Sequence, residues 1–150
     1  MKKYCLIIQS SSNDTGVASY IKSLLYFFEN DNINITIISN KNGWKKYYPN
    51  IIRFYENQII EYLRKILIFF RFKKIGIICL SVFDKIINHL SKEKYDLIIF
   101  PTASSLTYFM KSDYIVSVHD LMHIYEKKFN ESGGFLTFIY RQNLYKNISK

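Results

Sequence analysis

Two histidines and an aspartate follow a strand-like run in the last third of the chain. The run 114–118 is apolar and rich in β-branched residues, and it leads into His119 and Asp120, with His123 close behind. Imidazole and carboxylate groups serve enzymes as general acids, general bases and electrostatic stabilisers. A polar pair at the end of an apolar strand predicts either a site at the sheet edge or a hydrogen-bonded strand terminus. Position alone leaves both open.

The same residues raise the question of a metal site. The stretch His-Asp-Leu-Met-His has the spacing of the His-Glu-x-x-His zinc signature, which requires both histidines on one helical face. His119 ends a β-branched run, so that geometry is not expected, and Asp120 is one methylene shorter than the glutamate that acts as base. Glu126 and Glu131 are the nearby candidates for a third ligand. We therefore expect no metal and no cofactor here.

The hydrophobic pattern predicts the scaffold that positions these residues. Apolar runs predict strands over 4–9, 33–39, 95–100 and 114–118, and helical spacing predicts helices over 17–30, 56–72, 81–91 and 135–150. A short helix over 102–110 and a loop or irregular strand over 40–55 complete the pattern. Strand, helix and strand in succession form a βαβ unit with a right-handed crossover. We therefore predict an α/β fold: a Rossmann-like, doubly wound parallel sheet in a single domain, 1–150.

The helix expected over 56–72 has one apolar face. Arg64, Lys65 and Arg71 are expected off that face, which is formed by Ile59, Ile60, Leu63, Ile66, Leu67 and Phe70. The stretch 61–74 thus combines an apolar face with five basic residues. Two interpretations stay open: the helix docks on an anionic bilayer surface, or it packs on the sheet with a solvated basic edge.

In an open parallel sheet, ligands bind at the carboxyl ends of the strands. Two stretches with polar or ionisable side chains are expected at these ends: the loop 10–16 after the first strand, and the His119-Asp120 pair. The loop, SSSNDTG, precedes a helix N-terminus, which Asp14 or Thr15 can cap and where backbone N–H groups attract phosphate. It has one glycine, Gly16, and so lacks the dinucleotide and Walker fingerprints. A phosphate site and an ordinary capped loop both remain open.

The composition of the chain limits the classes of binding partner and the cellular compartment that we expect. The chain has 21 basic and 12 acidic residues, a net charge of +9, which favours polyanions such as nucleotide phosphates, nucleic acid or anionic lipid. The aromatics fit core spacing, without a nucleic-acid-binding pattern, so no nucleic-acid partner is expected. Cys5 and Cys79 both lie in apolar runs and are predicted to be buried thiols, which suits a reducing cytoplasm. No uninterrupted apolar stretch reaches the roughly 18 residues of a membrane span.

Four stretches stand in a recognisable order along the chain. They are NDTGVASYIKSLL, YDLIIFPTASS, YIVSVHDLMHIYEKKF and RQNLYKNI. Together they resemble the N-terminal domain of a GT-B-fold retaining glycosyltransferase of the family 4 type. The strand followed by His-Asp-Leu is the most specific element of the four, and the resemblance covers nearly the whole chain.

The resemblance implies a function and residue roles. Such enzymes transfer a hexose from a nucleotide-sugar to a glycan or a lipid-linked acceptor. His119 would lie near the donor sugar and the reacting centre, and Asp120 would support that loop. His123 is expected to be a structural residue or a substrate-binding residue at the rim of the site. Thr15 and Gly16 would let the backbone approach the donor phosphates or the acceptor. Thr15 stands where the family often has another glycine, and its Cβ occupies part of that space.

The resemblance also implies a second Rossmann-like domain that binds the nucleotide-sugar, and these 150 residues do not include one. We therefore expect an acceptor-side domain that ends within the helix 135–150. The isolated chain should bind nucleotide-sugar weakly and transfer no sugar. The alternative is a non-catalytic basic α/β subunit that recruits a separate catalytic glycosyltransferase subunit to the membrane. Either protein is expected in the cytoplasm, with peripheral attachment at the inner face of the cell membrane as an option.

Overall fold

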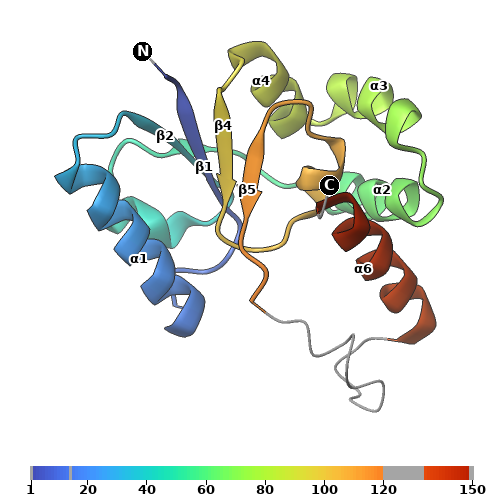
Figure 1. Ribbon diagram of the computed structural model, residues 1–150, viewed down its shortest axis with the longest axis horizontal. Helices are drawn as coiled ribbons and strands as arrows, with labels where there is room; N and C mark the ends of the chain where they lie inside the picture. The colour runs from blue at the N-terminus through green and yellow to red at the C-terminus, as the bar shows by residue number, and fades with distance from the viewer. Residues whose placement is uncertain (1, 14, 120–133, 149–150) are drawn as a thin grey trace.

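The computed structural model describes residues 2–13, 15–119 and 134–148. The described chain contains a sheet of five parallel strands in the order β3-β2-β1-β4-β5 (Figure 1). The strands are β1 (Tyr4–Ile8), β2 (Ile35–Ser39), β3 (Ile52–Arg53), β4 (Leu97–Phe100) and β5 (Tyr114–Val116). The chain builds outward from β1 to β3, returns across the sheet to β4, and builds outward again to β5. This order confirms the predicted α/β parallel sheet and is consistent with a Rossmann-like fold.

Helices flank both faces of the sheet (Figure 1). Helix α1 (Thr15–Asn30) and the 3-10 helix η1 (Asn42–Lys46) supply apolar side chains to the core on one face. The core on the other face is larger. It receives side chains from α2 (Gln58–Phe69), α3 (Lys73–Phe83), α4 (Lys85–Glu93), the 3-10 helix η2 (Ser105–Phe109) and α6 (Gly134–Ile148).

The central strand β1 shows why the apolar runs become strands. Its side chains alternate between the two faces: Leu6 and Ile8 pack with α1, whereas Cys5 and Ile7 pack in the larger core. All four are at most 2% exposed. A parallel strand covered on both faces needs a continuous apolar sequence, and YCLII provides it.

The predicted helices over 56–72 and 81–91 are wrong in their limits. Helix α2 ends at Phe69, Arg71 adopts a left-handed conformation with φ 59°, and α3 begins at Lys73. Asp84 then separates α3 from α4, because its Oδ1 accepts hydrogen bonds from the backbone N–H groups of Ile86 and Ile87 at 3.0 and 3.3 Å. Apolar residues continue on both sides of Arg71 and Asp84, so the hydrophobic pattern does not show where α2 and α3 end.

The orientation predicted for α2 is right only in part. Arg64, expected off the apolar face, is 1% exposed, whereas Ile59 and Phe70 are 76% and 57% exposed. Ion pairs from Arg64 to Glu56 and Asp84 explain the difference, because they hold the guanidinium inside the protein. Of the predicted apolar face, Ile60, Leu63 and Leu67 pack against the core, whereas Ile59, Ile66 and Phe70 face outward.

Smaller differences concern element ends and one cysteine. Strand β4 begins two residues later than predicted, β5 ends at Val116, and η2 is a 3-10 helix within the short helix expected at 102–110. Cys5 is buried as predicted, but Cys79 is exposed, because it lies on the outer side of α3. None of the helices in the described ranges is long and apolar enough to cross a membrane.

Candidate functional site

The carboxyl ends of β1, β4 and β5 lie along one edge of the sheet because the strands are parallel. The strand order reverses direction between β1 and β4, and the crevice outside the carboxyl ends at such a point is the usual ligand position in open α/β sheets. The loop after β1 leads into α1 at this edge, and His119 follows β5 there. The two stretches singled out in the sequence therefore share one edge of the molecule.

His119 is anchored to the end of the neighbouring strand. Its Nε2 lies 2.6 Å from the carbonyl oxygen of Pro101, the residue that follows β4. A carbonyl oxygen only accepts, so Nε2 must carry the hydrogen of this bond. In the neutral ring, Nδ1 then keeps its lone pair for another partner. His119 is exposed, so the ring is accessible to a ligand at this edge.

Tyr20 of α1 closes the same site from the other side. Its ring meets the ring of His119 edge-on, with centroids 5.4 Å apart and an interplanar angle of 74°. Its hydroxyl lies 2.9 Å from Oγ of Ser117, just beyond β5. Neither Tyr20 nor Ser117 was among the predicted site residues, because the sequence pattern marks them only as members of a predicted helix and a predicted strand. The sequence signal for this contact was the hydroxyl of Tyr20, a polar group on an aromatic side chain in the second turn of α1.

Gly16 lies one helical turn before Tyr20. Residues four apart share a helix face and are separated by about 6 Å along the axis. A Cβ at Gly16 would meet nothing within 4 Å, so packing within the described protein does not require a glycine there. Thr15 is the first residue of α1, and Asp14 lies outside the described residues. The structure thus brings the start of α1 and His119 to one place.

Glu56 joins the ends of three strands beside this site. Its Oε1 accepts a hydrogen bond from Nε2 of Gln9, after β1, at 3.1 Å, and its Oε2 accepts one from Nδ2 of Asn40, after β2. Arg64 Nη1 donates to the same Oε1 at 2.9 Å. Glu56 itself follows β3, so a single carboxylate ties together the loops after β1, β2 and β3. Glu56 was not among the site residues predicted from the sequence.

Arg64 extends this network into the interior. Its Nε donates to Oδ2 of Asp84 at 2.7 Å, and its Nη1 lies 3.4 Å from Oγ of Ser105 in η2. One guanidinium therefore lies between two carboxylates, and both carboxylates are engaged by neighbouring donors. The network fixes the loops of the edge; its groups are occupied in holding structure and are poorly placed to react.

Two buried polar atoms near this edge have no hydrogen-bond partner among the described residues. They are Oγ of Ser10, two residues after β1, and Oδ1 of Asn40, directly after β2. Buried polar atoms are normally satisfied, and the exceptions often mark places where water or a ligand binds. Both atoms belong to loops at the carboxyl edge.

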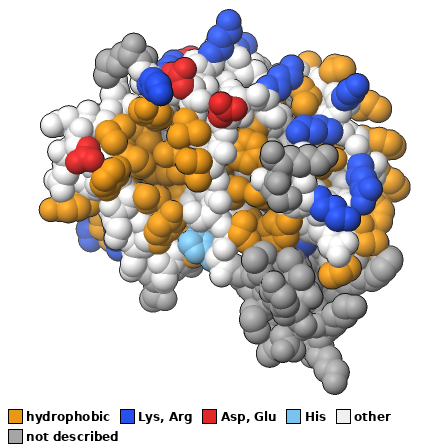
Figure 2. All heavy atoms as spheres, viewed as in Figure 1, with side chains coloured by type: hydrophobic (Ala, Val, Ile, Leu, Met, Phe, Trp, Pro, Cys, Tyr) orange, Lys and Arg blue, Asp and Glu red, His pale blue; other side chains and the backbone are white. Residues whose placement is uncertain are grey.

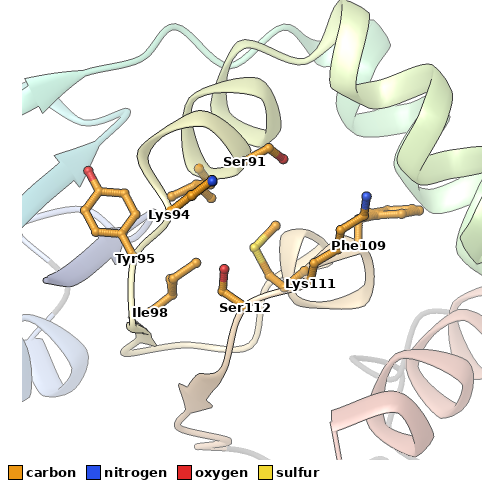
Figure 3. Close-up of a pocket in the computed structure, with 9 residues that line it drawn as sticks. Ser91, Lys94, Tyr95, Ile98, Phe109, Lys111 and Ser112 are labelled. Atoms are coloured by element: carbon orange, nitrogen blue, oxygen red, sulfur yellow. The ribbon is translucent and has the colours of Figure 1, made fainter. Parts of the chain in front are cut away.

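A hollow of about 310 Å³ lies at the opposite, amino edge of the sheet (Figure 3). Lys94 and Tyr95, just before β4, line it together with Lys111 and Ser112, just before β5. Two lysines make it a possible anion pocket, but it lies across the sheet from His119. It therefore cannot form part of the predicted site.

The metal ligands considered in the sequence cannot be assembled from the described residues. Within 2–13, 15–119 and 134–148 there is no group of three or more His, Cys, Asp and Glu side chains that could hold a metal ion. Asp120, His123, Glu126 and Glu131 lie outside the described residues, so the roles predicted for them stay predictions.

Comparison with known proteins adds no relative to this picture. No protein-family model, no curated protein and no solved structure matches the chain. The chain is therefore placed by its own architecture, a five-stranded parallel α/β sheet flanked by helices and consistent with a Rossmann-like fold.

Proposed function

We propose that this chain is the N-terminal, acceptor-side domain of a GT-B-type glycosyltransferase. The reaction is transfer of a hexose from a nucleotide-sugar to a glycan or lipid-linked acceptor. The observation that supports it best is the position of His119, held by the Pro101 carbonyl and the Tyr20 ring at the carboxyl edge. The resemblance of its sequence element to the strand and His-Asp-Leu of that family supplies the chemistry.

The chemistry assigns distinct tasks to the residues of the edge. The bond between the anomeric carbon and the donor phosphate oxygen breaks, an acceptor hydroxyl oxygen bonds to the carbon, and the hydroxyl proton passes to the departing nucleoside diphosphate. His119 Nδ1 accepts a hydrogen bond from a hydroxyl of the donor sugar and so orients it. Backbone N–H groups at the start of α1, around Gly16, face the developing negative charge of the phosphates. The roles proposed for Asp120 and His123, which lie outside the described residues, are to support the loop of His119 and to contact the substrate at the rim of the site.

The donor nucleotide requires a second domain in this proposal. The isolated chain then offers one wall of the cleft, binds nucleotide-sugar weakly and turns nothing over. Incubation of the purified chain with radiolabelled nucleotide-hexoses and a membrane lipid extract tests this. No labelled glycan or glycolipid is expected. Robust transfer by the purified chain would show that it is a complete enzyme and not the acceptor-side half.

The alternative is a non-catalytic subunit that brings a catalytic glycosyltransferase subunit to the membrane. The large exposed apolar surface of α2 and α3 favours it over other non-enzymatic functions. Affinity purification of the tagged chain from its source cells distinguishes the two. Stoichiometric recovery of a separate donor-binding chain, with a His119→Asn variant that retains full activity in that complex, would favour the subunit over the catalytic domain.

A further inference from the structure

Exposed apolar side chains are concentrated on two consecutive helices. Of the seventeen large hydrophobic residues exposed in the described chain, nine lie between positions 59 and 83. On α2 and just beyond it they are Ile59, Tyr62, Ile66, Phe70 and Phe72, and on α3 they are Ile75, Ile78, Val82 and Phe83. A soluble surface rarely gathers so many without a partner.

Their spacing forms two regular stripes. Along α2 the exposed residues recur at intervals of three and four, from Ile59 to Phe70, and along α3 the same holds from Ile75 through Ile78 to Val82. Each stripe is one face of a helix. Ile78 and Val82 are both 70% exposed, so these faces point away from the core of the protein. We call the exposed residues of α2 and α3, together with Leu136 of α6, the outer helical face.

A groove deepens this face between α2 and α6. It has a volume of about 490 Å³. Its apolar lining includes Tyr62, Ile66, Phe70 and Leu136, and its cationic lining is Lys65 and Arg141. Burial raises the pKa of Tyr140, at the base of the groove, to about 12, so its hydroxyl stays neutral. The groove therefore combines an apolar trough with positive charge at its sides.

Basic side chains lie beside the apolar residues of the outer helical face. Lys65, Arg71 and Lys74 are exposed on or next to α2 and α3. The acidic residue among these side chains is Glu61, which pairs with Lys65 at 2.7 Å. Figure 2 shows Lys and Arg side chains gathered beside hydrophobic ones over the part of the surface formed by α2, α3 and α6. An occupant of this face must be apolar and negatively charged at once.

From this complementarity we infer that the outer helical face docks on a lipid bilayer that contains anionic lipid. The apolar stripes enter the boundary between headgroups and acyl chains, and the basic side chains meet lipid phosphates. A second copy of the chain fits this face poorly, because it would place lysines and arginines against one another. The inference does not rest on the glycosyltransferase proposal, and it extends the expected contact from 61–74 to both helices and α6.

The test is flotation of the chain with vesicles of phosphatidylcholine alone or mixed with an equal amount of phosphatidylglycerol. The wild type should float with the anionic vesicles and stay behind with the neutral ones. An Ile78→Ser/Val82→Ser variant should lose binding by about tenfold or more, because two apolar side chains no longer enter the bilayer. The matched control is Tyr26→Ser/Phe27→Ser, which removes two exposed apolar residues from α1 and should bind like the wild type.

Charge is tested separately with Lys74→Gln, which should weaken binding roughly fivefold. Lys92→Gln, an equally exposed lysine of α4, should leave it unchanged. Fluorescence of the single buried tryptophan, Trp44, reports whether each variant is folded. Equal flotation with both vesicle types, equal loss in the α1 control, or no flotation at all would overturn the inference. So would a concentration-dependent dimer that Ile78→Ser/Val82→Ser abolishes, which would identify a second copy as the occupant.

Discussion

The guanidinium of Arg64, on α2, meets the carboxylate of Asp84, at the junction of α3 and α4, at 2.7 Å inside the protein. Their side chains are 1% and 2% exposed. Asp84 also caps α4, and Arg64 reaches Glu56, which gathers the loops after β1, β2 and β3. One buried ion pair thus connects the helical layer to the edge of the sheet where His119 lies.

Removal of the Arg64 charge should destabilise the fold strongly. Arg64→Met leaves two carboxylates without their cation, and breaking a buried pair costs about 3–5 kcal/mol. Urea unfolding measures the change in the free energy of unfolding. The matched control is Arg53→Met, at an exposed arginine of β3, where a change within about 0.5 kcal/mol is expected. Equal effects of the two substitutions would show that the ion pairs of Arg64 do not contribute to the free energy of unfolding.

Two glycines of helices should respond in opposite directions to alanine. At Gly76 of α3, an added Cβ would lie 2.5 Å from Cε1 of the buried Phe109, so Gly76→Ala should cost about 1–3 kcal/mol. At Gly16 of α1 the space is open, and Gly16→Ala should stabilise the helix by up to about 1 kcal/mol. Thermal denaturation of both variants checks the signs. A stable Gly76→Ala protein would mean that α3 and η2 can separate freely.

The fold should lose stability at alkaline pH, and the buried hydroxyl of Tyr140 should account for part of this loss. Burial raises the pKa of Tyr140 from its ordinary 10.0 to about 12, and that of Cys5 from 9.0 to about 12. Both groups stay protonated in the fold while the unfolded chain loses its protons. Their contribution is therefore complete below about pH 9 and is lost as the pH rises to 12, at about 1.4 kcal/mol per pH unit for each group.

Tyr140→Phe removes one of these two groups. Its free energy of unfolding should fall less steeply than that of the wild type between about pH 10 and about pH 12. Tyr55→Phe, at a tyrosine that is 89% exposed, should follow the wild type. Urea titrations at several alkaline pH values give the slopes. Parallel slopes for wild type and Tyr140→Phe would contradict the burial of this hydroxyl.

The two cysteines should differ sharply in reactivity. Cys79 is exposed on α3, whereas Cys5 is buried in β1 and its pKa is raised to about 12. A chromogenic disulfide reagent should therefore modify one thiol rapidly in the native protein and a second only after unfolding. Cys79→Ser should abolish the fast phase. A fast phase that survives this substitution would mean that the β1 region opens readily.

The strands β1, β2, β4 and β5 and the helix α1 could be predicted because their signals are local, whereas the two-residue strand β3 lies in a stretch predicted as a loop or irregular strand. The run 4–9 is apolar throughout, and a strand buried on both faces requires that. The break at Arg71 has no such signal, since a left-handed residue is usually glycine or asparagine. The inward position of Arg64 could not be predicted either, because it depends on Asp84, twenty residues away.

The candidate site shows the same division between local and distant signals. The position of His119 at the carboxyl edge followed from the order of strands and helices, which the sequence pattern carries. Its partners did not follow from that order. Tyr20 and Ser117 are 97 residues apart, and their contact depends on how α1 lies against β5. Periodicity describes one element at a time and says nothing about such a contact.

We propose that the edge formed by His119, Tyr20 and the start of α1 receives a nucleotide-sugar. Amide NMR spectra of the ¹⁵N-labelled chain, recorded during titration with UDP- and GDP-hexoses, test it most directly. We predict weak, fast-exchange shifts at Gly16, Tyr20 and His119. These shifts should vanish in His119→Asn and persist in His89→Asn, a substitution at a histidine of α4. Shifts confined to the amino-edge pocket of Lys94 and Lys111, or no shifts at the highest concentrations, would contradict the claim.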